Sequence, residues 1–151
     1  MTPLEVTGLD HLYLTVSDFA ASERFYDLVL KPLGFKKRRA PIGGDPHAHY
    51  YNRVMQLSIR PARTRAAHDS YAPGLHHVCL RLGNRADIDA AAEALGALGV
   101  RVTEPKLYPE YAPDYYAVFF EDPDGLRFEL VALRQRRRDI VEQWDTLGDD
   151  I

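Results

Sequence analysis

The sequence lacks several features that mark common protein classes. Its 151 residues include one cysteine, Cys79, which excludes an internal disulfide and zinc-finger spacing and fits a reducing compartment. Cys79 lies in an apolar strand pattern, so we expect it to be buried filler and not a nucleophile. No apolar run reaches membrane-spanning length, and the N-terminus shows no signal pattern. With a net charge of −3 as well, we expect a cytoplasmic protein that binds neither nucleic acid nor membrane.

The sequence does contain a short motif that occurs twice. Gly8-Leu-Asp-His-Leu-Tyr-Leu returns 66 residues later as Gly74-Leu-His-His-Val-Cys-Leu. Each copy places a histidine, His11 or His77, at the start of an alternating apolar run that is typical of a β-strand. Histidine is the commonest metal ligand, so the repeat suggests a metal site built from two related halves.

The repeat continues into a matching order of predicted elements. Ser17-Asp18 and Asn84 are typical helix N-caps, and helices are predicted after them over Phe19–Leu30 and Ala86–Leu98. One strand precedes each helix and three extended segments follow it. The predicted strands are Leu12–Val16, Lys36–Arg39, His49–Asn52, Val54–Ile59, Val78–Leu82, Arg101–Thr103, Tyr115–Glu121 and Leu126–Leu133. Each half therefore has the order β-α-β-β-β.

Two halves of this kind predict one α+β domain, because each exposes an apolar sheet face that the other can cover. We expect a first module over residues 7–60, a linker over 61–72, a second module over 73–133 and a tail over 134–151. Asp122–Gly125 predicts a hairpin turn, and a helix is expected in the tail over Arg137–Leu147. Glu104–Pro113, with three prolines and two tyrosines, predicts a long functional loop.

The last predicted strand contains a charge that its pattern does not explain. Glu129 interrupts an otherwise apolar strand, and a charge there must be paired, metal-bound or on the solvated face. Alternation puts Arg127 and Glu129 on one face, where they could form a simple surface ion pair. Aligning the two halves places Gln56 at the position that corresponds to Glu129.

Two imidazoles and one carboxylate form a ligand set that leaves coordination positions open for substrate and suits Fe, Mn, Ni or Zn. His11, His77 and Glu129 would supply this set. Gln56, a weak neutral oxygen donor, could be a fourth ligand, a hydrogen-bond partner behind the ligands or a contact for substrate. A histidine at a strand start is more often a hydrogen-bonded rim residue, but its occurrence in both halves weakens that interpretation. By alternation, His76 should point away from His77.

Several aromatic and polar side chains are expected to reach the same cavity. Tyr13 lies two residues from His11 and therefore on its face, and His49 and Tyr51 share a face in the same way. Packing in the cavity wall is the more common role for such residues. The expected cavity residues are Tyr13, His49, Tyr51, Tyr115 and Tyr116.

Four stretches that span nearly the whole chain match a known family. They are His11-Leu-Tyr-Leu-Thr-Val-Ser-Asp-Phe, Phe25-Tyr with Leu33-Gly-Phe, Gly74-Leu-His-His-Val, and Tyr116-Ala-Val-Phe-Phe-Glu-Asp-Pro-Asp-Gly-Leu-Arg-Phe-Glu-Leu. The closing Asp-Pro-Asp-Gly-x-x-x-Glu phrase is the most specific. Through these stretches the chain resembles the vicinal-oxygen-chelate superfamily, which includes glyoxalase I, bleomycin-resistance proteins, fosfomycin-resistance enzymes, extradiol dioxygenases and methylmalonyl-CoA epimerase.

The resemblance implies that the two modules form a mixed, partly open eight-stranded barrel around a divalent metal. Its ligands would be His11, His77 and Glu129. The implied activity is that of a metal-dependent lyase, isomerase or dioxygenase whose small substrate is chelated through two adjacent oxygens, in a homodimer. Gln56 stands where glyoxalase enzymes often have a glutamate, which favours the three-ligand pattern of dioxygenases and fosfomycin-type transferases. The alternative is a metal-free, bleomycin-resistance-like protein that sequesters a small ligand.

Overall fold

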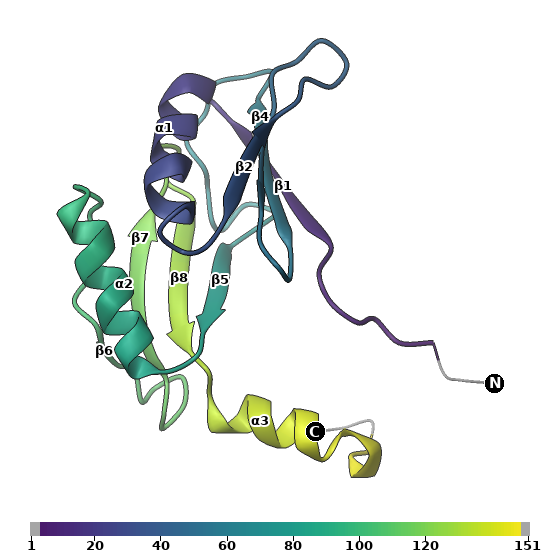
Figure 1. Cartoon of the computed structure of the whole chain (residues 1–151), viewed down its shortest axis with the longest axis vertical. Helices are drawn as coiled ribbons and strands as arrows, with labels where there is room; N and C mark the ends of the chain where they lie inside the picture. Colours follow the sequence, from purple (N-terminus) through teal and green to yellow (C-terminus); the bar gives the residue numbers. More distant parts are fainter. Residues whose placement is uncertain (1–3, 149–151) are drawn as a thin grey trace. The chain divides into compact units, whose positions relative to one another are not determined.

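Each half of the chain forms one four-stranded mixed sheet with one helix packed on it (Figure 1). The computed structural model describes residues 4–148. Their contacts fall into two compact units: residues 4–69 with 122–126, and residues 70–121 with 127–148. The predicted α+β class with two βαβββ modules is confirmed. The described strands form two four-stranded sheets that are not closed into a barrel.

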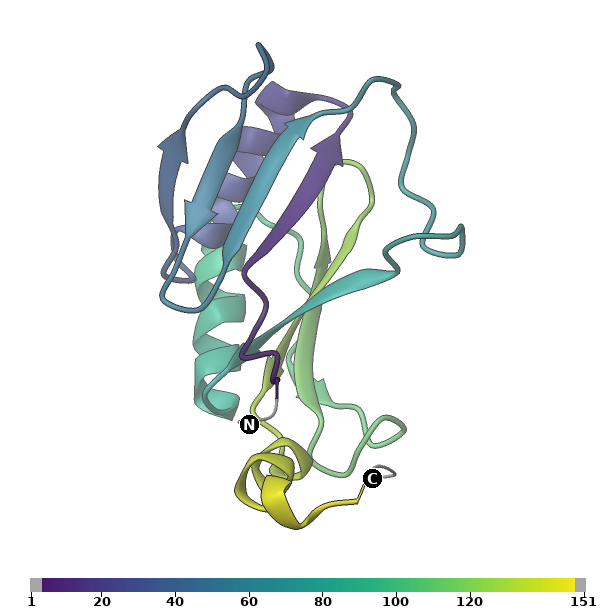
Figure 2. The ribbon, with the colours of Figure 1, turned by 90° about the vertical axis from the view of Figure 1, so that its right-hand side faces the viewer.

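In the first unit the strand order is β1-β4-β3-β2. Strand β1 (His11–Val16) runs parallel to β4 (Gln56–Pro61), and β3 (Ala48–Tyr51) pairs antiparallel with both β4 and β2 (Lys36–Arg39). Helix α1 (Phe19–Leu30) connects β1 to β2 and covers one face of this sheet, as Figure 2 shows. The opposite face of the sheet is therefore left without a helix from this unit.

The second unit repeats this arrangement in the order β5-β8-β7-β6. Strand β5 (His77–Leu82) is parallel to β8 (Arg127–Ala132), and β7 (Tyr116–Glu121) is antiparallel to β8. The short β6 (Lys106–Leu107) forms the edge, and α2 (Arg85–Ala97) packs on β7 and β8. Helix α3 and a 3₁₀ turn follow β8 at Gln135–Glu142 and Trp144–Thr146, where a longer tail helix was predicted.

The two long helices have the same kinds of residue at their N- and C-terminal ends. These residues are recognisable in the sequence, so the helix positions could be predicted well. The Asp18 side chain accepts a hydrogen bond from the first turn of α1, and Asn84 with Asp87 forms a capping box on α2. Gly34 and Gly99 follow the helices with φ angles of 86° and 82°. Only glycine adopts this left-handed conformation without strain, so both helices stop at a defined residue.

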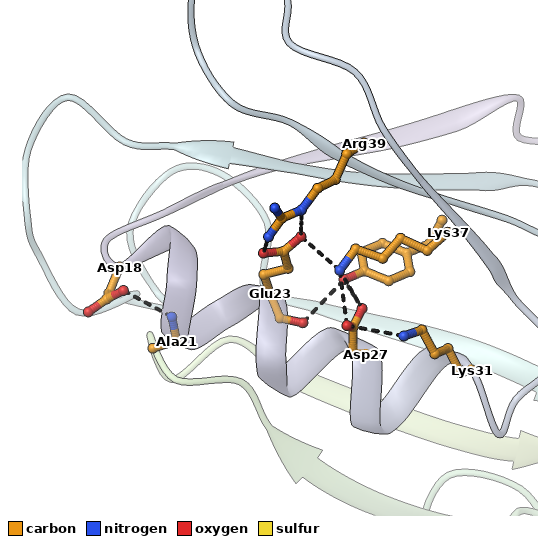
Figure 3. A network of polar contacts seen from close by, with 8 residues as sticks. Asp18, Ala21, Glu23, Asp27, Lys31, Lys37 and Arg39 are labelled. Carbon is orange, nitrogen blue, oxygen red and sulfur yellow. Dashed lines mark hydrogen bonds and ion pairs between the residues drawn. The ribbon is translucent and has the colours of Figure 1, made fainter.

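A network of ion pairs fastens α1 to the sheet of the first unit (Figure 3). The buried Glu23 carboxylate accepts hydrogen bonds from the Arg39 guanidinium and lies 2.7 Å from Lys37 Nζ. Asp27 accepts from Lys37 Nζ at 2.9 Å and from the Tyr50 hydroxyl at 2.8 Å. The hydrogen bond from Arg39 outweighs the opposing effect of burial and lowers the pKa of Glu23. The network therefore keeps its acidic groups ionised at neutral pH.

The predicted hairpin turn after β7 is confirmed, and its contacts place it in the first unit. Gly125 has a φ angle of 84°, and the Asp122 carboxylate accepts hydrogen bonds from the backbone N–H groups of Asp124 and Leu126 at 2.9 and 2.8 Å. The Tyr26 hydroxyl of α1 donates to Asp122 at 2.7 Å. Burial raises the pKa of Asp122 despite these hydrogen bonds.

One predicted strand, Arg101–Thr103, is wrong, because β6 lies farther along at Lys106–Leu107, inside the predicted loop. Thr103 still bonds to β7: its N–H donates to the Phe119 carbonyl at 2.9 Å. Its hydroxyl, however, accepts from the Phe119 N–H at 2.9 Å. A side chain thus replaces the carbonyl that a β-ladder would use, so no strand is formed there.

Within residues 4–148, no helix has the length and apolar character needed to cross a bilayer.

Candidate functional site

Alternation gives each sheet one face under its helix and an opposite, more polar face. In β1, Leu14 and Val16 are buried, whereas His11 and Tyr13 are exposed on the other side. In β8 the residues under α2 are apolar, and Glu129 lies on the face away from that helix. The residues expected to form a site therefore lie on the faces that the helices leave uncovered.

Glu129 is a buried carboxylate with one unsatisfied oxygen. The residue is 3% exposed, and its Oε1 atom has no hydrogen-bond partner. His77 Nε2 lies 3.7 Å from Oε2, and the Tyr115 hydroxyl and the Cys79 thiol also interact with the carboxylate. Such burial costs several kcal/mol (about 3–5 for an uncompensated charge) unless a cation or a set of donors compensates it.

The surface ion pair between Arg127 and Glu129 is not formed. Among the described residues Arg127 makes no ion pair within 4.0 Å, and its guanidinium lies over the Phe119 ring, 4.5 Å from the centroid. Phe119 is the cross-strand partner of Glu129 on β7. The arginine thus packs on an aromatic ring while the carboxylate is buried beside it, so the surface-pair interpretation is wrong.

His77 is held by its neighbour His76. The two Nδ1 atoms lie 2.7 Å apart and the rings form an edge-to-face pair, so the expectation that His76 points away is wrong. The reason is that β5 begins at His77, and strand alternation does not extend to the residue before it. With Nδ1 occupied, Nε2 of His77 is the nitrogen directed toward Glu129.

The side chains of His77 and Glu129 line a pocket of about 580 Å³ within the second unit. Its wall includes Tyr111, Tyr115 and Phe119, whose rings contact one another or the neighbouring Tyr108 edge to face. The predicted loop contributes Glu110 and Tyr111 to this wall. The complete lining is His76, His77, Glu110, Tyr111, Tyr115, Phe119, Arg127, Glu129 and Arg134.

Tyr115 and Cys79 stay protonated beside the Glu129 carboxylate. Burial, followed by the interaction with Glu129, raises the pKa of Tyr115 well above its usual value. Desolvation and the same carboxylate raise the pKa of Cys79 to about 12, although the residue is partly open to solvent. The expectation that Cys79 is buried is therefore wrong, but its thiol is not activated as a nucleophile.

Tyr116, the first residue of β7, does not line the pocket. The Tyr116 hydroxyl donates to Asp89 of α2 at 2.7 Å, and Arg85 lies over its ring. Tyr115, just before the strand, lines the pocket. Tyr116, which the sequence placed in the cavity, thus packs against the helix.

On the polar face of the first unit, His11 and Gln56 are direct partners across β1 and β4. His11 Nδ1 lies 2.7 Å from an Asp10 carboxylate oxygen, which leaves Nε2 as the outward nitrogen. The Gln56 amide donates to Ser58 Oγ at 2.7 Å and lies 3.4 Å from His49 Nδ1. Gln56 is thus already engaged in hydrogen bonds on this face.

The remaining predicted cavity residues of the first unit form an aromatic group on the same face. His49 is buried and bonds Ser58 Oγ at 2.8 Å, with Tyr13 and Tyr51 within 6.3 Å of its ring centroid. His47 stacks on His49 at 5.6 Å and was not expected. The alternating His47-x-His49-x-Tyr51 pattern was the signal that could have found it.

The strand register corrects the alignment of the two halves. His11 pairs with Gln56 and His77 pairs with Arg127, so Gln56 corresponds to Arg127. The partner of Cys79 is Glu129, and the equivalent position in the first unit is Ser58. The sequence alignment was off by two residues. A shift of two residues preserves the face of every side chain in a strand, so the apolar pattern cannot detect it.

The structure thus brings two of the three predicted ligands together within one unit. His77 and Glu129 lie side by side in the second unit, and His11 belongs to the first. Across residues 4–148, no group of three or more His, Cys, Asp or Glu side chains is arranged to hold a metal ion.

The model of the glyoxalase/bleomycin resistance protein/dioxygenase superfamily matches the chain over residues 8–130. The chain is 31% identical over 125 residues to the uncharacterised protein YqjT of Bacillus subtilis, covering 82% of this chain and 98% of that one. It is 26% identical over 126 residues to the metallothiol transferase FosB of Bacillus licheniformis, covering 83% and 75% of the two chains.

Two solved structures share the fold. A glyoxylase/bleomycin resistance protein/dioxygenase domain from Frankia sp. superposes with a TM-score of 0.71 at 24% identity, covering 86% of this chain and all of that one. A mutant of the fosfomycin resistance protein FosX of Listeria monocytogenes, complexed with Mn(II) and 1S,2S-dihydroxypropylphosphonic acid, gives 0.66 at 17% identity. That match covers 89% of this chain and 98% of the FosX chain.

Proposed function

Because the chain belongs to the glyoxalase/bleomycin resistance protein/dioxygenase superfamily, we propose that it is a metal-dependent enzyme whose small substrate is chelated to a divalent ion through two adjacent oxygens. The observation that carries this proposal is the buried carboxylate of Glu129, with its unpartnered Oε1 next to His77 in a pocket. A divalent cation is the simplest partner for such a group.

We propose His11, His77 and Glu129 as the ligands. Two features support the set besides the sequence repeat. Nδ1 of each imidazole is occupied by the preceding side chain, Asp10 or His76, so that Nε2 is the nitrogen left to bind an ion. Imidazole nitrogens and one carboxylate suit Zn, Ni, Mn or Fe. Gln56 is proposed to act behind these ligands, since its amide is already bonded to Ser58.

A bound divalent ion would act as a Lewis acid that stabilises negative charge on the chelated oxygens. The residues of the second unit would supply the surroundings for this chemistry. Tyr115 keeps its proton, interacts with Glu129 through its hydroxyl and would help to hold that carboxylate in place. Phe119 and Tyr111 would supply an aromatic part of the pocket wall.

The names of two similar proteins support the enzymatic part of the proposal. FosB is a metallothiol transferase, and FosX was crystallised with Mn(II) and a ligand that has two adjacent hydroxyl groups. We extend to this chain the class of chemistry, which includes lyase, isomerase, transferase and dioxygenase reactions. Tyr13, His49 and Tyr51 are proposed to line the substrate cavity. A single domain, a homodimer and a cytoplasmic location are part of the same proposal.

A second candidate function is a metal-free protein that sequesters a planar ligand. The rings of Tyr108 and Tyr111 stack at 5.8 Å, and Tyr115 meets Tyr111 edge to face at 5.3 Å. Such a wall binds flat apolar molecules without help from a metal.

Metal analysis of the purified full-length protein separates the two candidates. We expect one divalent ion per chain in the wild type and in His68→Ala, and loss of that ion in His77→Ala. Stoichiometric metal that persists in His77→Ala would refute the ligand set. A protein without metal whose ligand binding survives chelator treatment would establish the second candidate.

A further inference from the structure

The pocket of the second unit contains two arginines without an acidic partner. Arg127 and Arg134 both line it and are half-buried. Among the described residues neither makes an ion pair within 4.0 Å. The other half-buried arginine, Arg60, is paired with Asp45. A guanidinium that is partly removed from water and left unpaired loses hydration that a ligand can replace.

Each of the two guanidinium groups is positioned by an aromatic ring. Arg127 lies over Phe119 with its Cζ atom 4.5 Å from the ring centroid, and Arg134 lies over Tyr115 at 5.1 Å. Contact with a ring face restrains the guanidinium while its N–H donors remain available at the edge. That is the arrangement in which arginine binds a carboxylate or phosphate through two parallel hydrogen bonds.

The acidic residues of the pocket do not pair with these arginines. They are Glu129, which lies beside His77, and Glu110, which is exposed at the rim. Neither carboxylate lies within 4.0 Å of a guanidinium, so both arginines can bind an anion with or without a metal. His76 and His77 add no negative charge.

We infer that the substrate carries an oxyanion, either a carboxylate or a phosphate-type group, which Arg127 and Arg134 bind beside the reacting oxygens. This inference rests on the proposed function for the site but uses residues outside the proposed ligand set. The aromatic wall of Tyr111, Tyr115 and Phe119 would contact the body of the substrate.

The test measures binding of phenylphosphonate, benzoate and neutral benzyl alcohol by calorimetry to the full-length protein in the presence of a chelator. The chelator removes any direct contribution of a metal. We expect saturable binding of at least one anion, weakened about tenfold or more in Arg127→Gln and in Arg134→Gln. Arg136→Gln, which alters an exposed arginine of the same tail, should bind like the wild type. The stronger of the two anions identifies the oxyanion class.

Arg127→Lys provides a second variant that retains the charge and loses the planar fork. Its affinity should lie between those of the wild type and Arg127→Gln. The inference is overturned if neither anion binds in the millimolar range, if benzyl alcohol binds as well as the anions, or if both glutamine variants match Arg136→Gln. A chain that binds the anions but contains no metal would refute the proposed function and leave the oxyanion site intact.

Discussion

Glu129 shows how one residue can reveal a site. A glutamate in a buried strand normally has a cation or several donors around it, whereas this carboxylate has an imidazole at 3.7 Å, the neutral Tyr115 and Cys79 side chains and one oxygen without a hydrogen-bond partner. Arg127 lies two residues away on the same face but stacks on Phe119. Proteins retain such unfavourable groups mainly where function requires them, because a neutral residue would fold better.

We predict that Glu129→Gln stabilises the metal-free protein by about 1 kcal/mol, since it removes a buried charge while preserving shape. Affinity for divalent metal should fall at least about tenfold in the same variant, since an amide is a weaker ligand than a carboxylate. Urea unfolding and metal titration measure the two effects. Glu121→Gln, at an exposed position of β7, is the control and should change neither. A clear loss of stability in metal-free Glu129→Gln would show that the carboxylate has a partner in the folded chain.

At the scale of single elements, the two helices are defined by short local interactions. Capping side chains begin them, left-handed glycines end them, and in α1 a charged network attaches the helix to the sheet. These features lie within a few residues of each other in sequence, apart from the ion pairs. Local features of this kind predict boundaries well because no distant contact is needed to form them.

Replacing each of two glycines at the end of α2 by alanine should change the stability of the protein in opposite directions. Gly99 has a φ angle of 82°, so Gly99→Ala should destabilise the protein by about 1 kcal/mol. Gly96 lies inside the helix, and an added Cβ would meet nothing within 4 Å. Gly96→Ala should therefore stabilise by about 0.5–1 kcal/mol. Thermal unfolding of both variants checks the pair, and equal effects would contradict the assigned end of α2.

Glu23→Gln should destabilise the protein by about 1–2 kcal/mol at pH 7, because it removes the charged partner of Arg39 and one of the two carboxylates that bind Lys37. The pKa of Glu23 is lowered on folding from its ordinary value of 4.5. Its contribution to stability is therefore fully present above about pH 4.5 and is lost as the pH falls through the lower, folded value.

Chemical unfolding at pH 7 and below pH 4 measures this difference. The gap between wild type and Glu23→Gln should narrow at acid pH. Glu93→Gln, which alters an exposed position on α2, should stay within about 0.5 kcal/mol of the wild type at both pH values. A gap that does not depend on pH would mean that Glu23 contributes by packing and not by charge.

At the scale of the whole molecule, the chain contains two units with the same element order and different contents on their polar faces. The first has hydrogen-bonded groups, among them Gln56, Ser58 and His49. The second has a carboxylate with one unpartnered oxygen and two unpaired arginines around a pocket. The two units thus share one arrangement of strands and differ in the side chains on their polar faces.

If both halves supply ligands to one ion, metal should stabilise the whole chain. Mn²⁺ or Zn²⁺ at one hundred times its dissociation constant would add about 2.7 kcal/mol to the free energy of unfolding. His11→Ala and His77→Ala should each abolish the increase, and His68→Ala should retain it. Thermal shift with and without chelator measures the effect. A full increase in His11→Ala would show that the first unit contributes no ligand.

The helices and strands could be predicted from the sequence more completely than the contacts within the site. The helices over Phe19–Leu30 and Arg85–Ala97 and most strands could be predicted, because capping residues and alternation are local. The strand at Arg101–Thr103 could not be excluded, since the Thr103 hydroxyl takes the place of a carbonyl only when β7 lies beside it. The pairing of Gln56 with His11 across β1 and β4 likewise could not be predicted from the sequence.

The sequence by itself determined the repeat, the order of elements and the faces of the strands, because each follows from the spacing of residues along the chain. Only the tertiary structure decided that Glu129 is buried with one oxygen unpartnered, that Arg127 packs on a ring, and that His76 contacts His77. Burial and ion pairing depend on which distant segments meet. Two charged residues on one face of a strand have the same spacing in the sequence whether they form a surface ion pair or line a pocket separately. The sequence therefore cannot distinguish the two arrangements.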